Sequence, residues 1–456
     1  MPALPLFEHQ RAEQVLAYRG GQPISAGRFL QDARALARRL PPGGHVLNLC
    51  ADRYRFTVGL AASLIGGKCS LLPPAHTPEV VRQLLSFAPD TICLTDDPQC
   101  VLQLPLLVYP DEQLEQIPLS DDDFHVPQID AAQLAAYIFT SGSTGIPVPH
   151  RKTWGRLIQC VRLEAQRLSP IDRGGCAILG TVPPQHMYGF ESTVLLPLHS
   201  RGMLCAGRPF FPADIATALA QLPRPRVLIT TPVHLRSLLT AEVVLPALDL
   251  IVSATAMLPT NLAREVEQRY TAPLLEIYGS TETGQMAARR TALDDHWQLW
   301  PGVRLELVDE RCWAQGGHIE QATAVADVLE LKGTDRFVLH GRTADLVNIA
   351  GKRSSLGYLN HQLNAIPGVV DGAFFVRDDA QASLAGIARV AALVVAPSLD
   401  VAEILQQLRE RIDPVFLPRP LLRVKALPRN ETGKLPQQTL RTLVAEAAAS
   451  APHLFA

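Results

Sequence analysis

The chain has 456 residues, of which 47% are hydrophobic and 19% charged, and its formal net charge is −2. This length suits a large domain with a smaller one. A nearly neutral chain lacks the basic field of a nucleic-acid-binding protein, and no apolar run reaches the roughly 18 to 20 residues that cross a bilayer. The N-terminus lacks the basic start and apolar stretch of a secretory signal. We therefore expect a cytoplasmic protein with no membrane span, no nucleic-acid partner and, since its eight cysteines have no zinc-like spacing, reduced core thiols.

Helical and strand patterns alternate through the first hundred residues. Apolar residues recur at helical spacing over 29–40, after Ser25 as N-cap, and a short buried strand follows at 46–50. The alternation continues with a helix at 56–65, a strand at 70–72, a helix at 80–87 and a strand at 91–94. Such alternation predicts an α/β fold with a largely parallel sheet.

The pattern continues and then changes. Further strands are expected at 137–139, 177–179, 227–229, 250–252 and 274–277, with helices between them such as 258–270. After about residue 345 come a helix at 356–363, strands at 373–376 and 390–395, a helix at 401–411 and a last helix after Pro436. We predict a large α/β N-terminal domain over 1–341, a hinge at 342–345 and a small α+β C-terminal domain over 346–456.

A loop of small, hydroxyl-bearing residues follows the strand at 137–139. Its residues are Thr140, Ser141, Gly142, Ser143, Thr144 and Gly145. Glycines let backbone N–H groups converge on a phosphate, and the hydroxyls add donors. The Gly-Lys-Ser/Thr of a Walker A loop is absent. Taken alone, this run is as compatible with an ordinary Ser/Gly-rich turn as with a phosphate-binding loop.

The strand at 274–277 ends in a second polar loop. Its residues are Tyr278, Gly279, Ser280, Thr281, Glu282, Thr283 and Gly284. Ligands of open parallel sheets lie beyond the carboxyl ends of the strands, so both loops lie where a nucleotide would bind. Tyr278 would stack on a base, Thr281 would bond a phosphate and Glu282 would hold Mg²⁺. Helix capping by Glu282 is the alternative.

Together, the two loops resemble motifs of the adenylate-forming superfamily, which includes acyl-CoA synthetases, peptide-synthetase adenylation domains and firefly luciferase. Further segments resemble that family's motifs in the expected order. They are the acyl-pocket motif at 183–190, the adenine loop at 253–256, the inter-domain segments at 341–342 and 351–353, and the C-terminal motif at 427–434 with its lysine. Asp327 stands before Gly341 at the spacing of the family's ribose-binding aspartate. The resemblance covers nearly the whole chain.

The resemblance implies a role for each matched residue. Lys434 would bridge the carboxylate and the α-phosphate, and His186, Thr281 and Glu282 would join it in catalysis, with Glu282 on the magnesium. The nucleotide would contact Thr140, Ser141, Gly142, Ser143, Thr144, Gly145, Ala254, Thr255, Tyr278, Gly279, Ser280, Asp327 and Arg342. The acid would contact His186, Tyr188, Gly189, Phe190, Ser253 and Ala254.

The family implies that ATP and Mg²⁺ activate a carboxylic acid as its acyl-adenylate and that a phosphopantetheine thiol then takes the acyl group. Because Lys434 cannot also occupy the thiol's path, the small domain would rotate between the two steps. The short length and the variant loop at 141–150 look most like stand-alone AMP ligases of aryl-polyene and xanthomonadin pigment clusters. That resemblance implies a hydroxybenzoate-type acid and an acyl carrier protein.

Other interpretations stay open. A basic patch for an acidic carrier protein is as compatible with the sequence as a scattered solvated face; its residues would be Arg419, Arg423, Lys425 and Arg429. The acceptor could instead be free CoA, or the chain could be a degenerate nucleotide-binding protein. Glu191 would stabilise a helix N-terminus or bond a substrate hydroxyl.

The chain departs from the family pattern in four places. Val148 stands where the family has a lysine, and Arg151 or Lys152 are candidate replacements. Val325 and Ala326 replace a Thr-Gly pair, and Ala344 replaces the hinge Asp or Lys. The β-rich segment between Glu282 and Asp327 looks short.

Overall fold

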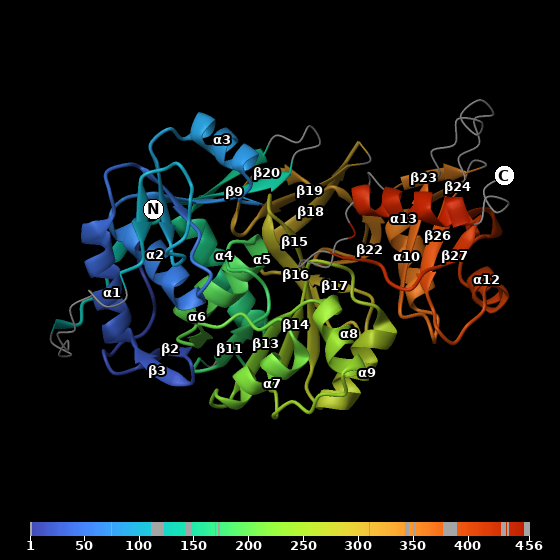
Figure 1. Ribbon diagram of the computed structural model, residues 1–456, viewed down its shortest axis with the longest axis horizontal. Helices are drawn as coiled ribbons and strands as arrows, with labels where there is room; N and C mark the ends of the chain where they lie inside the picture. The colour runs from blue at the N-terminus through green and yellow to red at the C-terminus, as the bar shows by residue number, and fades with distance from the viewer. Residues whose placement is uncertain are drawn as a thin grey trace.

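The structure is a computed structural model that describes residues 2–450 except 74, 111–122, 142–146, 169, 172–173, 310, 343–345, 350–351, 377–389, 430–434 and 436. None of the described helices combines the length and apolar character that a bilayer crossing needs. A large body holds the N-terminal three quarters of the chain, and the C-terminal segment lies at one side of it (Figure 1).

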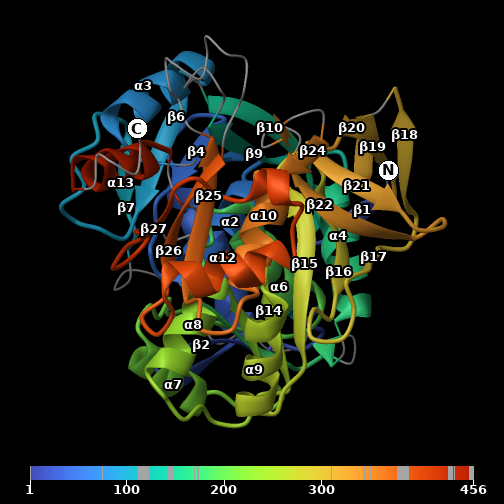
Figure 2. The same cartoon turned by 90° about the vertical axis from the view of Figure 1, so that its right-hand side faces the viewer.

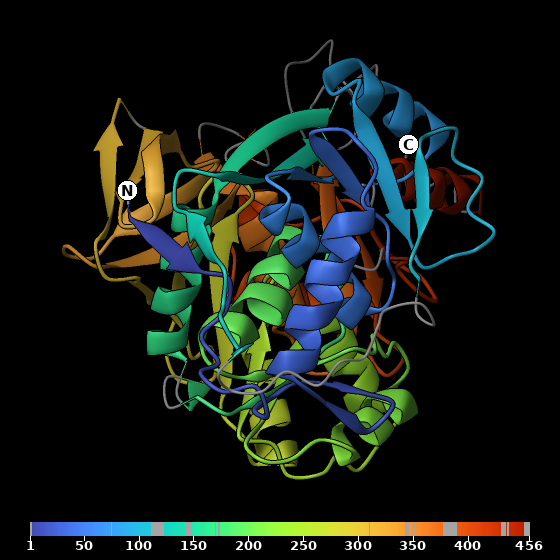
Figure 3. The same ribbon diagram turned by 90° about the vertical axis from the view of Figure 1, so that its left-hand side faces the viewer.

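A six-stranded sheet opens the body, with the order β10-β9-β5-β4-β6-β7. Its parallel strands are β4 (His45–Asn48), β5 (Cys69–Leu72), β6 (Thr91–Thr95), β7 (Leu106–Val108) and β9 (Leu134–Ser141). β10 (Pro147–Thr153) returns antiparallel to β9. The helices of this region are α1 (Ala26–Arg39), α2 (Arg53–Ile65) and α3 (Pro78–Phe87), and Figure 3 shows α1 and α2 from their outer side. As predicted, Ser25 caps α1, because its side chain accepts from the Arg28 N–H.

The second sheet has eleven strands in the order β21-β22-β17-β16-β15-β14-β13-β11-β12-β2-β3. Its parallel centre is β15 (Leu274–Ser280), β14 (Leu250–Ser253), β13 (Arg226–Thr230), β11 (Ala177–Gly180), β12 (Met203–Cys205) and β2 (Val15–Arg19). The remaining strands pair antiparallel: β3 (Gln22–Ser25), β16 (Gly284–Arg289), β17 (Trp297–Leu299), β21 (Asp327–Leu331) and β22 (Arg336–Arg342).

Helices bury both faces of this second sheet. On the face toward the first sheet lie α4 (Trp154–Arg167), α5 (Met187–Gly189), the π-helix η3 (Phe190–Leu195) and α6 (Leu196–His199). On the opposite face lie α7 (Pro212–Ala220), α8 (Pro232–Thr240) and α9 (Thr260–Tyr270). Burial on both faces explains the continuous apolar runs that identified these strands in the sequence.

Smaller sheets complete the body. β1 (Ala3–Pro5) pairs with β8 (Gln128–Asp130). The segment between Glu282 and Asp327 contributes a three-stranded sheet of β18 (Val303–Val308), β19 (Arg311–Gly316) and β20 (Ile319–Ala324).

The C-terminal segment has its own apolar clusters. It comprises β23 (Leu346–Ile349), β24 (Lys352–Ser355), α10 (Leu356–Asn364), β25 (Asp371–Val376), β26 (Val390–Val395), α12 (Val401–Arg409), η5 (Pro414–Phe416), β27 (Leu421–Arg423) and α13 (Gln437–Ser450). Figure 2 shows this segment in front of the body.

The predicted elements are found with small shifts at their ends. α12 ends at Arg409, two residues before the predicted end, and Arg342, the first residue of the predicted hinge, closes β22 opposite Asp327. The rest of the hinge, including Ala344, lies outside the described residues, and the domain boundary stays a prediction. All eight cysteines are free thiols, as expected.

Candidate active site

The two predicted loops begin at strand ends of different sheets. Thr140 lies near the end of β9, and 279–282 lie at and beyond the end of β15. The side chain of Ser141 and residues Gly142, Ser143, Thr144 and Gly145 lie outside what the structure describes. β10 returns along β9 with Val148 opposite Thr140 and His150 opposite Ile138.

His150 connects the two loops. Its Nε2 lies 2.9 Å from Thr140 Oγ1 and 3.6 Å from Glu282 Oε1. Lys152, two residues on and on the same side of the strand, donates from Nζ to the Glu282 carbonyl oxygen at 3.2 Å. The first sheet therefore places an imidazole and an ammonium group against the loop that carries Glu282, and the Thr140 hydroxyl contacts that imidazole.

Glu282 keeps its charge at this position. Its side chain is 40% exposed. Partial burial alone would raise the pKa of this carboxyl, but its own backbone N–H, the Ser280 hydroxyl and the charges of His150 and Lys152 outweigh burial and lower the pKa. Burial lowers the pKa of His150 more than Glu282 raises it.

The loop geometry depends on two glycines. A Cβ on Gly279 would lie 2.3 Å from the Gly284 carbonyl oxygen, and Gly284 has φ +73°. Ser280 and Thr283 bond to each other across the turn. The turn leaves Gly279, Ser280 and Glu282 exposed and Thr281 half-buried, so these residues face outward where the sequence placed a ligand.

Tyr278 and Asp327, two of the predicted nucleotide contacts, are hydrogen-bonded to each other. The Tyr278 hydroxyl donates to Asp327 Oδ2 at 2.6 Å, and the Tyr278 ring packs on Phe337 and Trp297 at centroid distances of 5.2 and 5.5 Å. Arg342 is opposite Asp327 in the β21–β22 ladder, and its side chain is outside the described set. Stacking of Tyr278 on a base stays a prediction.

The predicted adenine loop is strained. Ser253 closes β14, Ala254 is buried, and Thr255 has φ +77°, a rare conformation for a β-branched residue. Such strain persists only where the surroundings hold it, and it is concentrated at functional sites. Here the buried Glu276 accepts the Leu258 N–H at 2.8 Å and pairs with Arg289 at 2.8 Å. Glu276, two residues before Tyr278, was not predicted as a site residue.

The acyl-pocket residues are mostly built into the core. The Tyr188 hydroxyl donates to the Val252 carbonyl at 3.1 Å, and Phe190 is fully buried against Phe56. A Cβ on Gly189 would lie 2.0 Å from the Pro183 carbonyl oxygen. His186 is half-buried at the start of the helix. Contact of these residues with an acid stays a prediction.

The residues present fit a magnesium ion. Glu282 offers charged oxygen, and the described residues contain no cluster of three or more His, Cys, Asp or Glu side chains that would hold a metal alone. Mg²⁺ commonly takes one or two carboxylates and fills its shell with phosphate and water. Lys434 lies outside the described residues.

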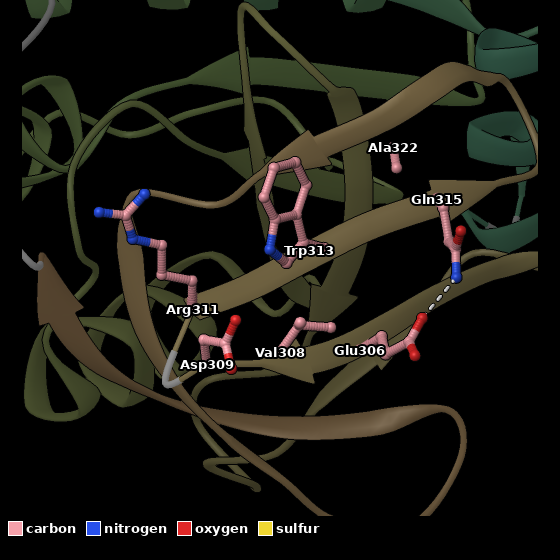
Figure 4. Close-up of a pocket in the computed structure, with 7 residues that line it drawn as sticks. All are labelled: Glu306, Val308, Asp309, Arg311, Trp313, Gln315 and Ala322. Atoms are coloured by element: carbon pink, nitrogen blue, oxygen red, sulfur yellow. Dashed lines mark hydrogen bonds between the residues drawn. The ribbon is translucent and has the colours of Figure 1, made fainter.

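Two cavities lie away from these loops. One is an open pocket of about 510 Å³ on the β18–β20 sheet. It is lined by Trp313, with Arg311, Gln315 and Glu306 around it (Figure 4). The other, of about 150 Å³, lies between α8 of the body and α10 and β25 of the C-terminal segment. Neither is lined by Thr140, His150 or Glu282.

Comparison with known proteins decides the family. The model of the family described as AMP-binding enzyme matches residues 8–316, more than half of the chain. The chain belongs to the AMP-binding enzyme family. The predicted adenylate-forming enzyme is thereby confirmed, whereas the pigment-cluster subclass stays a prediction.

Relatives and a solved structure agree with this assignment. The chain is 30% identical over 233 residues to a 4-coumarate–CoA ligase of Rhodobacter capsulatus, covering 50% of this chain and 57% of that enzyme. It is 30% identical over 304 residues to a 4-coumarate–CoA ligase of Halorhodospira halophila, covering 65% and 73%. ATP-bound MatB from Rhodopseudomonas palustris has the same fold, with a TM-score of 0.77 over 96% of this chain and 97% of that one at 20% identity.

Proposed function

We propose that the chain uses ATP to activate an aryl carboxylic acid as its acyl-adenylate, releases pyrophosphate, and passes the acyl group to a phosphopantetheine thiol. The contact of Thr140, His150 and Glu282 carries this proposal, because it brings both phosphate-loop candidates to one place. Tyr278 of β15, four residues before Glu282, is hydrogen-bonded to Asp327 of β21.

The first step is displacement at phosphorus. A carboxylate oxygen attacks the α-phosphorus of ATP, the bond to the bridging oxygen of pyrophosphate breaks, and pyrophosphate leaves with that electron pair. Negative charge on the phosphate oxygens is stabilised by groups already in place, for which we propose Lys434 and the hydroxyl of Thr140. A magnesium ion held by Glu282 would supply further positive charge when bound.

The acid is proposed to be aromatic, of the hydroxybenzoate type. The names of the two relatives specify 4-coumarate, an aryl acid. An amino acid substrate would need a carboxylate in the pocket to bind its α-amino group. Glu191, next to the acyl-pocket motif, is buried and accepts from the Cys160 thiol at 3.2 Å, so we do not assign it that role.

The acyl acceptor has two candidates. The relatives' names specify CoA. An acyl carrier protein of a pigment pathway is the other, and Arg419, Arg423 and Lys425 are exposed on the C-terminal segment, whereas Arg429 is paired with Asp371. In either case we propose that 346–456 rotates about 342–345 between the two steps.

The test is acid-dependent ATP–pyrophosphate exchange with a panel of aryl, fatty and amino acids. We expect exchange with hydroxybenzoates or hydroxycinnamates and little with the other classes. Selection of fatty or amino acids would contradict the aryl proposal. Product analysis with CoA and with holo-carrier protein then distinguishes the two candidate acceptors, because the acyl thioester will accumulate only on the acceptor that the enzyme uses.

A further inference from the structure

A buried ion pair lies behind the predicted adenine loop. Glu276 of β15 and Arg289 of β16 are opposite each other in the antiparallel β15–β16 ladder, and their side chains are 3% and 7% exposed, respectively. The Nε and Nη2 atoms of Arg289 both lie 2.8 Å from Glu276 Oε2. The Thr291 hydroxyl donates to the same oxygen at 2.8 Å. One oxygen of the carboxylate thus bonds only within the sheet, and the other, Oε1, contacts the loop.

Both ends of the loop at 254–257 are attached to Glu276. Ser253, the last residue of β14, is opposite Glu276 in the parallel β14–β15 ladder. Leu258, the first residue after the loop, donates its backbone N–H to Glu276 Oε1 at 2.8 Å. Between these two points Thr255 has φ +77°, a conformation that a β-branched residue keeps only where its surroundings hold it. Glu276 therefore fixes this strained loop through its backbone at one end and its carboxylate at the other.

The same ion pair supports Tyr278. Glu276 and Tyr278 are two residues apart in β15, so their side chains project from the same face of the sheet. The Arg289 guanidinium carbon lies 4.5 Å from the centre of the Trp297 ring. That ring packs on the ring of Tyr278 at a centroid distance of 5.5 Å, and the Tyr278 hydroxyl is bonded to Asp327. A continuous series of contacts therefore joins the adenine loop, the ion pair and the predicted ribose-binding aspartate.

Stability is a poor explanation for this ion pair. Two charges are costly to remove from water, and a buried pair is often no more stabilising than apolar side chains of the same volume. Hydrogen bonds to a carboxylate are directional, however, and they specify a geometry. Here they specify the relative position of the two segments that are proposed to contact adenosine.

We propose that Glu276, paired with Arg289, is a positioning residue for the adenosine half of ATP. Its carboxylate holds the 254–257 loop, and the pair as a whole holds the ring of Tyr278, so that the two segments keep one relative position around the base. Glu276 does not touch the nucleotide and acts through these segments. The inference rests on ATP being the substrate, as proposed above.

The test compares the three substrates of pyrophosphate exchange, because ATP contains adenosine whereas pyrophosphate and the acid do not. We expect Glu276→Gln to raise the ATP KM by about 10-fold and to leave the KM of pyrophosphate and of the acid within about 2-fold. The amide keeps the size of the side chain, but either Leu258 or Arg289 then meets a donor in place of an acceptor. A loss of folded protein alone would lower the rate and leave all three KM values unchanged.

Glu267→Gln is the matched control. Glu267 of α9 accepts the Leu274 N–H at 2.8 Å and pairs with Arg290 through two bonds of 2.9 Å. Its partners are thus of the same kinds as those of Glu276, a backbone N–H and an arginine. None of them belongs to the 254–257 loop, so we expect this variant to leave the ATP KM within about 2-fold.

Arg289→Lys tests the pair from its other side, and it decides the question if Glu276→Gln does not fold, which thermal unfolding will show. Lysine keeps the positive charge but lacks the planar fork that gives two donors to one carboxylate, so we expect the ATP KM to rise by about 3-fold.

The outcomes are distinct. An unchanged ATP KM in the folded variants, an equal rise in the KM of all three substrates, or an equal rise in Glu267→Gln would overturn this inference while the proposed function stands. A wild-type chain that shows no exchange with any acid would overturn the proposed function and this inference with it.

Discussion

Glu282 receives two contacts from the first sheet: His150 of β10 lies 3.6 Å from its carboxylate, and Lys152 of the same strand donates to its carbonyl oxygen. We expect Glu282→Gln to slow exchange on the order of 100-fold and to raise the Mg²⁺ concentration needed for half-maximal rate, because a charged oxygen ligand is lost. Glu320→Gln is the control, since this glutamate is exposed and pairs with Arg151. Equal Mg²⁺ dependence in wild type and Glu282→Gln would contradict the assignment.

Gly189 tests whether the acyl-pocket motif is a packed structure. Gly189→Ala places a methyl group 2.0 Å from the Pro183 carbonyl oxygen, so the backbone must move. We expect a loss of about 1–3 kcal/mol in the free energy of unfolding, measured by denaturant titration. Gly207→Ala is the control, because no atom lies within 4 Å of its added carbon, and it should change the free energy of unfolding little. Equal losses in the two variants would contradict close packing at Gly189.

The sequence predicts site residues that belong to a recognisable motif. It does not predict residues that reach the site only through the pairing of strands. Thr140, Glu282, Tyr278 and Asp327 were predicted and do form two pairs of neighbours, through His150 in one case and directly in the other. His150 was predicted only as the last residue of the variant loop at 141–150 and was given no role. Its role depends on the β9–β10 register, which no single residue type specifies.

At the scale of elements, the packing of α4 against η3 makes stability depend on pH. Burial raises the pKa of Glu164 in the folded chain from 4.5 to about 8, so the folded state binds a proton that the unfolded state releases above 4.5. This group's destabilising effect therefore begins as pH rises above about 4.5 and is greatest above about 8. We expect the stability of the wild type, measured by thermal unfolding, to decline between pH 5 and 8. In Glu164→Gln this decline should be less steep. A decline of equal slope in the variant would contradict the buried acid.

Elements were predictable where one periodicity dominates. The parallel strands and their helices were found because burial on both faces leaves continuous apolar runs, and α1 because Ser25 caps an amphipathic pattern. The short strands β16 to β20 were not located individually. They have at most six residues each, and β17 pairs with β22, a strand distant in sequence.

At the scale of the whole molecule, an ion triad joins the C-terminal segment to the body. Arg429 donates two bonds of 2.8 Å to Asp371 at the start of β25, and Arg236 of α8 lies 3.8 Å from the same carboxylate. We expect Asp371→Asn to weaken the association and to speed proteolytic cleavage within 342–345 several-fold. Asp400→Asn, at the cap of α12, is the control and should leave the rate unchanged. An unchanged rate in Asp371→Asn would show that the triad does not hold the segment.

The central claim is that an acid is activated by ATP where the body meets a lysine from the C-terminal segment. Acid-dependent ATP–pyrophosphate exchange in the wild type, Lys434→Ala and the exposed-lysine control Lys425→Ala tests it most directly. We expect exchange in the wild type and in Lys425→Ala, and a loss of about 100-fold or more in Lys434→Ala. Exchange in Lys434→Ala equal to the wild type, or no exchange in any of the three, would contradict it.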